Sequence, residues 1–335
     1  MPGAWTHILS SSEIMNKLNE DKYKKVLREN LKLYQLGAQG PDIFLYYCYL
    51  IPSKHKRVEK LGQRLHTDKT RDFILYFIYK LKEIKDYKEF NTLFSYVIGY
   101  ITHYALDTCM HPYIYYFGGI YHAELPESKK YDHYHRELET IIGLIQLEKK
   151  RKENPYKVHL HEEIDIGKNV PIIVKDTLKN AIKSVYSLEI KNYLVDYCYK
   201  DMKMGMKFLT DPNGKKENLF WIMEKFIEKT SGAKVLLNPR KIKDDKDYLN
   251  KEHKQWNHPS SLDEIINADA EELYYKGIER ALVLIDSVIK YLENETSEEE
   301  LKESIPNLSY ESGKPLEEYK KMIYFDCIFE NKNDM

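Results

Sequence analysis

The residues best suited to chemistry lie in one short run, His103-Tyr-Ala-Leu-Asp107-Thr-Cys-Met-His111. On an α-helix, spacings of four and eight residues rotate a side chain by only about 40° and 80°, so these three side chains can face one site. Neutral imidazoles and a carboxylate are common zinc ligands, whereas Cys109 points to another face. The run predicts either a metal site or a hydrogen-bonded His–Asp pair in the core.

The setting of Asp107 bears on this choice. From Phe90 to Met110 the chain is mostly apolar and contains no Lys or Arg. Burial of a carboxylate in such a helix is costly unless the charge is paired or bound to a cation. Any compensating cation must therefore come from another segment or be a metal ion. Pairs such as His55–Glu59, His159–Glu163 and His161–Asp165 have the same spacing in charged surroundings, and we expect them on the surface.

A second candidate pair comes from the run Tyr131-Asp-His-Tyr-His-Arg-Glu-Leu-Glu139. Both His133–Glu137 and His135–Glu139 have the helical spacing, but histidines two residues apart cannot share a face. Because His135 lies closer to the apolar stripe of this helix, we select His135 with Glu139.

Three upstream residues complete the candidates: His7, Asp42 in the turn Gly37-Ala-Gln-Gly-Pro-Asp42, and His66 just before Thr67. A loop Asp after Pro is more often a helix cap, and a loop His is more often solvated. Singly, these residues carry little weight.

Helical periodicity supplies the elements that must position these side chains. Ser10 and Glu13 have capping-box spacing and predict the start of a first helix, and a stripe from Tyr23 to Tyr34 predicts a second that ends at Gly37. Further helices are predicted over 67–84, 90–111 (ending at Pro112), 131–150, 174–208, 216–229, 262–293 (opened by Ser261 and Glu264) and 315–330. No convincing period-2 strand is visible, 211–214 predicts a turn, and 230–261 forms a long Lys-rich connection.

The predicted fold is therefore all-α: one helical domain over 1–335, with a metal-site half (1–150) and a helical second half (151–335). The charges nearly cancel, with 52 basic and 53 acidic residues, which does not favour nucleic acid as a partner. The four scattered cysteines and the absence of a visible signal peptide predict a reduced, cytoplasmic location. Because the 90–110 segment carries Asn91, His103 and Asp107, it is expected to be a buried helix and not a transmembrane span.

Taken together, these residues resemble the zinc-dependent phospholipase C family, which includes the catalytic domain of clostridial alpha-toxin. The matching pieces occur in the family's order: Thr6-His7, Gly40-Pro-Asp42, Leu65-His66, His103-x3-Asp107, His111-Pro112 and His135-x3-Glu139. The residues within these motifs are more similar to those of non-secreted bacterial members of the family than to those of the toxins. The Trp256-Asn-His258-Pro segment is similar to that subset too, with no role assigned.

The resemblance implies an all-α fold with up to three zinc ions and hydrolysis of a phosphodiester by metal-bound water. It assigns Asp42, His66, His103 and Asp107 to one metal, and His111, His135 and Glu139 to a second. His7 would join a bridging Asp107 at a third. Secreted members complete that third site with the free amine of an N-terminal tryptophan, whereas Trp5 is four residues inside this chain. We therefore expect two zinc ions with full ligand sets, and Asp42 as a ligand and candidate general base.

Two alternatives stay open. The first is a nuclease-like phosphodiesterase, although Lys149-Lys-Arg-Lys152 fits a solvated helix end better than a basic-aromatic groove. The second is a non-catalytic helical protein that metal ions stabilise. For a phosphodiesterase, both a phospholipid and a soluble phosphodiester fit the sequence.

Overall fold

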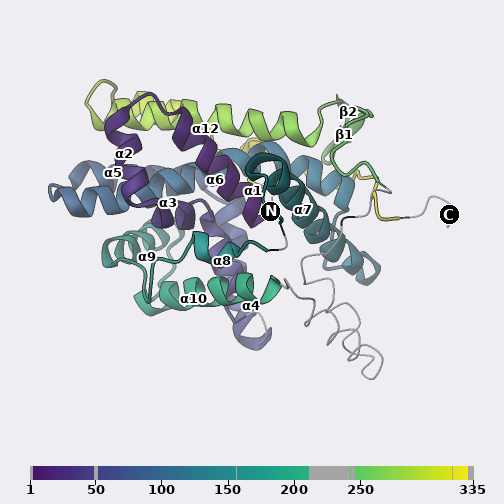
Figure 1. Ribbon diagram of the computed structural model, residues 1–335, viewed down its shortest axis with the longest axis horizontal. Coiled ribbons are helices and arrows are strands. Elements are labelled where there is room, and N and C mark those ends of the chain that lie inside the picture. The colour runs from purple at the N-terminus through teal and green to yellow at the C-terminus, as the bar shows by residue number, and fades with distance from the viewer. Residues whose placement is uncertain are drawn as a thin grey trace.

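The computed structural model describes residues 3–48, 52–155, 157–210, 242, 246–318 and 320–330. The predicted all-α class is confirmed. Helix α6 (Tyr87–Gly118) forms the centre and is buried along almost its whole length. It packs against α1 (Ala4–Lys17), α3 (Leu31–Gly37), α7 (Lys129–Arg151) and α12 (Ala270–Leu292). Figure 1 shows α12 along one edge of the molecule and α10 (Asn192–Leu209) along the opposite edge, with α6 between them.

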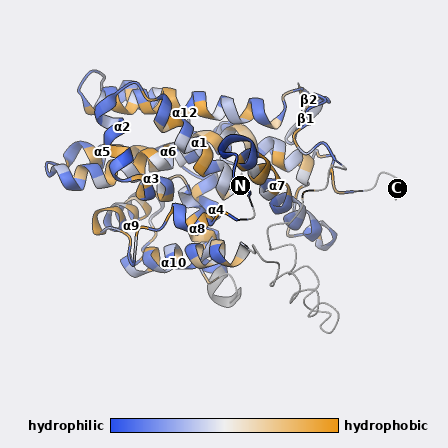
Figure 2. Cartoon of the chain, in the orientation of Figure 1, coloured by the Kyte–Doolittle hydropathy of each residue, from blue (hydrophilic) through white to orange (hydrophobic). Residues whose placement is uncertain are grey.

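The remaining elements surround this centre. They are α2 (Asp21–Glu29), η1 (Gly40–Tyr46), α4 (Pro52–Thr67), α5 (Thr70–Glu83), η2 (Pro126–Ser128), α8 (Leu160–Glu163), α9 (Ile172–Tyr186), β1 (Trp256–His258), β2 (Ser261–Ile266), α13 (Glu298–Ser304) and η5 (Leu316–Glu318). The hydropathy of the chain follows this arrangement, since the outer helices alternate between polar and apolar faces (Figure 2).

Two predicted boundaries in the metal-site half are wrong. Helix α1 begins at Ala4, and Ser10 lies inside it, where its hydroxyl donates to the carbonyl of His7. Such back-bonding to the preceding turn competes with a role as a cap. Helix α6 continues through Pro112 to Gly118, because dense packing around this turn outweighs the missing N–H. The prediction over 131–150 agrees with α7.

Other predicted helices are interrupted. The second helix breaks at Asn30 into α2 and α3, and the one over 174–208 divides into α9 and α10 at Ser187, which has a φ of 56°. His66 lies in the last turn of α4, not before a helix, because Lys69 with a φ of 48° separates α4 from α5.

The largest corrections concern the second half. Residues 256–266 form a two-stranded antiparallel hairpin, contrary to the expected absence of strands, and α12 starts later, at an Asp269–Glu272 capping box. The predicted 315–330 helix is reduced in the described residues to the single turn η5. The predicted 216–229 helix, the 211–214 turn and most of the 230–261 connection lie outside the described residues.

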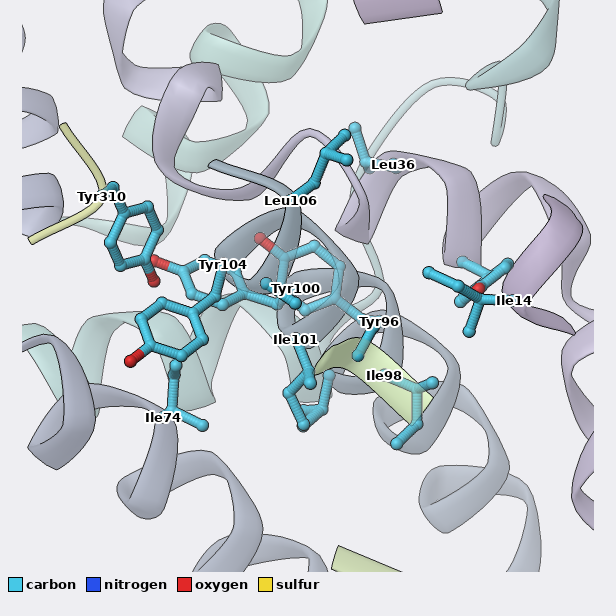
Figure 3. Close-up of a cluster of buried hydrophobic side chains, with 14 of the residues drawn as sticks. Ile14, Leu36, Ile74, Tyr96, Ile98, Tyr100, Ile101, Tyr104, Leu106 and Tyr310 are labelled. Carbon is cyan, nitrogen blue, oxygen red and sulfur yellow. The ribbon is translucent and has the colours of Figure 1, made fainter. Parts of the chain in front are cut away.

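The core is rich in aromatic rings. Tyr96, Tyr100 and Tyr104 project from α6 into the cluster shown in Figure 3, and the ring of Tyr310 packs 5.0 Å from that of Tyr104. Among the described helices, none combines the length and apolarity needed to cross a membrane.

Close backbone contact brings α3 against α6. A Cβ atom on Gly37 would lie 2.2 Å from the carbonyl oxygen of Tyr96, and one on Gly99 would lie 2.2 Å from that of Tyr34. Only glycine fits at both positions. This contact carries the next element, η1, and its Asp42 onto α6.

Candidate metal centre

All eight residues singled out from the sequence converge on one buried region. Helix α6 supplies His103, Asp107 and His111; α1 supplies His7, η1 supplies Asp42, α4 supplies His66, and α7 supplies His135 and Glu139. Among the described residues, their ligand atoms form three groups of metal-binding size: Asp42 with His66 and His103, His7 with His103 and Asp107, and His111 with His135 and Glu139.

Asp107 lies at the centre of these groups. Its Oδ1 is 3.2 Å from Nε2 of His7, and its Oδ2 is 3.0 Å from Nε2 of His103. Oδ2 also lies 3.6 Å from Nδ1 of His111 and 4.0 Å from Nε2 of His66. One fully buried carboxylate thus faces imidazoles from three helices.

Backbone carbonyls fix the orientation of three of these rings. Nδ1 of His66 donates to the carbonyl of Gly62 at 2.7 Å, Nδ1 of His103 to that of Ala38 at 3.1 Å, and Nδ1 of His111 to that of Tyr310 at 2.7 Å. A carbonyl oxygen can only accept, so Nδ1 must carry the hydrogen. In the neutral ring, Nε2 then presents a lone pair toward the carboxylates.

With neutral rings, this arrangement places the Nε2 lone pairs, which are hydrogen-bond acceptors, against carboxylate oxygens, which are acceptors too. His103 Nε2 approaches Asp42 Oδ1 at 3.8 Å as well as Asp107, and His66 Nε2 lies 3.0 Å from Asp42 Oδ1. Despite their short distances, the two oxygens of Asp107, both ring nitrogens of His7, and Nε2 of His103 and His111 are buried without a hydrogen bond. Buried polar atoms are normally satisfied, and lone pairs that converge on one point are satisfied by a cation.

The third group completes the centre on the α7 side. His135 Nε2 lies 2.9 Å from Glu139 Oε1, and His111 Nε2 lies 3.9 Å from the same oxygen. His133, the alternative weighed from the sequence, belongs to none of the three groups.

Electrostatics of the metal-free centre keep His111 and His135 neutral and Asp107 charged. Burial lowers the pKa of His111 and His135 well below the usual 6.5, so both rings are neutral near pH 7. Burial and the neighbouring His103 also lower the pKa of His7. For His103, burial is outweighed by the charges of Asp107 and Asp42, which raise its pKa. For Asp107, burial is outweighed by His103 and His111, which hold its pKa well below the usual range.

These residues fit zinc. Imidazole nitrogen and carboxylate oxygen bind Zn²⁺ at about 2.0–2.2 Å, so neighbouring ligand atoms of a tetrahedral site lie roughly 3.4 Å apart. The separations of 3.0 and 3.8 Å at Asp42 Oδ1, and of 2.9 and 3.9 Å at Glu139 Oε1, bracket that value. Within the described part of the chain, no Lys or Arg forms an ion pair with Asp107 or Asp42, so their counter-charge comes from imidazolium or from a metal ion.

The centre has a deep side and a shallow side. The side chains of His7, His103 and Asp107 have no exposed surface, whereas those of Asp42 and His135 are 7% and 13% exposed. Solvent therefore reaches the edge formed by Asp42, His66, His135 and Glu139.

The turn that carries Asp42 requires glycine. Gly40 has a φ of +52°, and a Cβ there would lie 2.3 Å from the ring of His103. The absence of a side chain lets η1 lie directly on the imidazole. Gly40-Pro-Asp42 is thus a packing motif as well as the source of a ligand.

Trp5 has a packing role in the described structure. It is buried in α1, its Cβ lies 3.3 Å from the Cβ position of Gly143 on α7, and the Arg151 guanidinium stands 5.5 Å from the centre of its ring. This contact holds α1, and with it His7, against α7.

Sequence reasoning missed the segment Leu308–Pro315, here called the C-terminal strap, which a β-bridge between those two residues closes. The N–H of Tyr310 donates to the carbonyl of His66, and its carbonyl accepts from His111. His258, to which the sequence assigned no role, also contacts this strap: its Nε2 lies 2.9 Å from the carbonyl oxygen of Ser312. These contacts use backbone atoms, for which the sequence has no signature.

Comparison with known proteins gives one match. A family model described as zinc-dependent phospholipase C covers residues 6–194, which is more than half of the chain and includes all eight candidate residues. Neither the curated proteins nor the solved structures gave a match.

Proposed function

Because the chain belongs to the zinc-dependent phospholipase C family, we propose that it is a zinc-dependent hydrolase of phosphodiesters, with the centre on α6 as its active site. The observation that carries this proposal is the buried Asp107, which faces four imidazoles without a Lys or Arg partner among the described residues. Three carboxylates in one pocket would be mutually repulsive without bound cations.

The ligand assignment follows the three groups. Asp42, His66 and His103 would hold one zinc ion, joined by Asp107, whose Oδ2 lies 3.0 Å from Nε2 of His103, and His111, His135 and Glu139 would hold a second. His7 and Asp107 would contribute to a third position. When bound, zinc ions would polarise a water molecule and offset the negative charge of a phosphodiester.

The residues of the chain would then perform three tasks. Asp42, at the shallow edge, would accept a proton from the attacking water, because a carboxylate has a second oxygen when the first faces His66. The carbonyls of Gly62, Ala38 and Tyr310 would hold the imidazoles in the tautomer that ligates. The apolar wall of α6 would exclude bulk water from the deep side, which strengthens electrostatic attraction.

The test compares zinc-loaded protein with its Asp42→Asn variant on p-nitrophenyl phosphorylcholine and bis-p-nitrophenyl phosphate. Asn keeps the shape but cannot accept the proton, so kcat should fall by at least about a hundredfold. The matched control is Asp72→Asn on α5, whose side chain is 52% exposed, and it should retain full activity. Full activity of Asp42→Asn would contradict the assigned role, and tight zinc binding without turnover of any phosphodiester would favour a structural centre.

A further inference from the structure

An exposed stripe runs along α10, opposite the side that packs on the body of the protein. Tyr193, Tyr197, Met204 and Phe208 are 62%, 50%, 61% and 44% exposed. At 100° per residue these four fall within about 60° of the helix surface, and at 1.5 Å per residue they span about 22 Å. Large apolar side chains that are exposed together in this way mark an interaction surface.

The charged side chains on the stripe itself are lysines. Lys200 falls between Tyr197 and Met204 on the same stripe, and Lys207 borders it beside Phe208. The two acids of α10 are bound to the body: Asp196 accepts from the N–H of Val170 and pairs with Lys175, and Asp201 accepts from the N–H of Cys48. The stripe therefore exposes aromatic rings and a thioether, with Lys200, which donates to Oδ1 of Asn169, and Lys207 among them.

This helix also contacts the element that carries Asp42. The ring of Tyr46, at the end of η1, lies 3.0 Å from the position that a Cβ atom on Gly205 would take. Just beyond η1, the backbone N–H of Cys48 donates a hydrogen bond to the carboxylate of Asp201. At 100° per residue, Asp201 lies about 20° beyond Phe208 and Gly205 about 60° beyond it, on the flank of α10 that borders the stripe. Figure 1 shows α10 at the outer edge of the helical body. Whatever binds the stripe is thus held against a helix that packs on the element carrying Asp42.

We propose that the α10 stripe, formed by Tyr193, Tyr197, Lys200, Met204, Lys207 and Phe208, docks the protein on an anionic phospholipid surface. Interfacial helices have this pattern, because apolar and aromatic side chains enter the acyl boundary while lysines reach the headgroup phosphates. The proposal rests on the proposed function and deepens it: the phosphodiester would be a lipid presented at a membrane. Lysines beside the apolar side chains, without a free acid on the helix, favour an anionic membrane over a second copy of this chain.

The experiment measures co-sedimentation of the full-length, zinc-loaded protein with vesicles of phosphatidylcholine alone or mixed with phosphatidylglycerol. We expect Tyr197→Ser/Met204→Ser to lower the partition coefficient by at least about tenfold, because two inserted side chains are lost. Lys200→Gln/Lys207→Gln should weaken binding to the mixed vesicles alone, and high salt should remove that difference. The matched control is Val283→Ser on α12, which replaces a residue that is 64% exposed outside the stripe.

A soluble substrate separates this proposal from the proposed function. The stripe variants should hydrolyse p-nitrophenyl phosphorylcholine at the wild-type rate, which also shows that they fold, and should act more slowly on vesicles. Stripe-dependent vesicle binding without any phosphodiester cleavage would sustain the docking surface and refute the hydrolase. Wild-type vesicle binding by Tyr197→Ser/Met204→Ser, or a stripe-dependent dimer without vesicle binding, would overturn the docking proposal.

Discussion

At the scale of single residues, Asp107 organises the centre. It has no exposed surface, and four imidazoles surround it at 3.0–4.0 Å, yet neither oxygen accepts a hydrogen bond. Three of those rings already donate Nδ1–H to backbone carbonyls, so they cannot all turn hydrogens toward the carboxylate. The geometry suits a shared cation better than a hydrogen-bonded core pair.

The buried histidines predict a pH dependence of the metal-free protein. The pKa of His111 and of His135 is lowered in the folded state, whereas the unfolded chain protonates near the usual 6.5. Below that pH the unfolded state binds more protons, so the free energy of unfolding falls as the pH falls. The raised pKa of His103 acts in the opposite sense.

Comparison with a variant isolates this contribution. Urea unfolding in chelator at pH 7.5 and pH 5.5 should show a smaller loss of stability for His111→Gln/His135→Gln than for wild type. Glutamine does not titrate, so the variant lacks the proton uptake of two histidines. An equal or larger loss in the variant would mean that these rings are already charged in the folded protein.

Much of the site could be predicted at this scale. The apolar, Lys- and Arg-free setting of Asp107 distinguishes it in the sequence from the His–acid pairs in charged segments, and the angle to the apolar stripe distinguishes His135 from His133. Tyr310 could not be found in this way, because it acts on His66 and His111 through its backbone. The grouping of His103 with His7 also depends on how α1 crosses α6.

At the scale of elements, the C-terminal strap ties the second half of the chain to the centre. Gly313 has a φ of +63°, and a Cβ there would lie 2.2 Å from the carbonyl oxygen of Thr108 on α6. The strap rests on α6 only because this residue is glycine. On the other side, His258 of β1 and the Lys314–Glu264 ion pair hold the strap to the hairpin.

Gly313→Ala should therefore displace the strap and loosen the rings of His66 and His111. We expect zinc affinity to fall by about 10- to 100-fold, as for the loss of other groups that orient ligands. Competition with a chelator of known affinity measures it. Gly167→Ala is the matched control: its φ is +96°, but nothing lies within 4 Å of its Cβ position, so it should lower stability by about 1–2 kcal/mol without changing zinc affinity.

Equal zinc affinity in the two variants would show that the strap plays no part in the centre.

The hairpin and strap were missed because neither has a long periodic segment. Their residues also lie far from α6 in sequence. By contrast, α7 and the body of α6 have long apolar periodicity and were predicted well, although Pro112 did not end α6.

At the scale of the whole molecule, the centre joins distant parts of the chain. Helices α1, α4, α6 and α7 and the turn η1 meet there, and the strap adds residues near position 310. The expected division into a metal-site half and a second half thus omitted part of the centre. Bound zinc would cross-link most of the fold.

Removal of metal should consequently lower the thermal stability of the entire protein. A ligand at a hundred times its dissociation constant stabilises the folded state by about 2.7 kcal/mol. With two such ions, chelation should lower Tm by at least about 5 °C. Calorimetry before and after chelation measures this shift; zinc should restore Tm and magnesium should not, since the ligands include imidazoles. An unchanged Tm would indicate that the buried charges are satisfied without metal.

The central claim is that the carboxylates and imidazoles around Asp107 hold zinc. The most direct measurement is a pair of anomalous difference maps from crystals of the zinc-loaded protein, collected just above and just below the zinc absorption edge. We predict strong peaks, present only above the edge, within the group of Asp42, His66 and His103 and within the group of His111, His135 and Glu139. Ordered side chains at both groups with no peak between them would contradict the account.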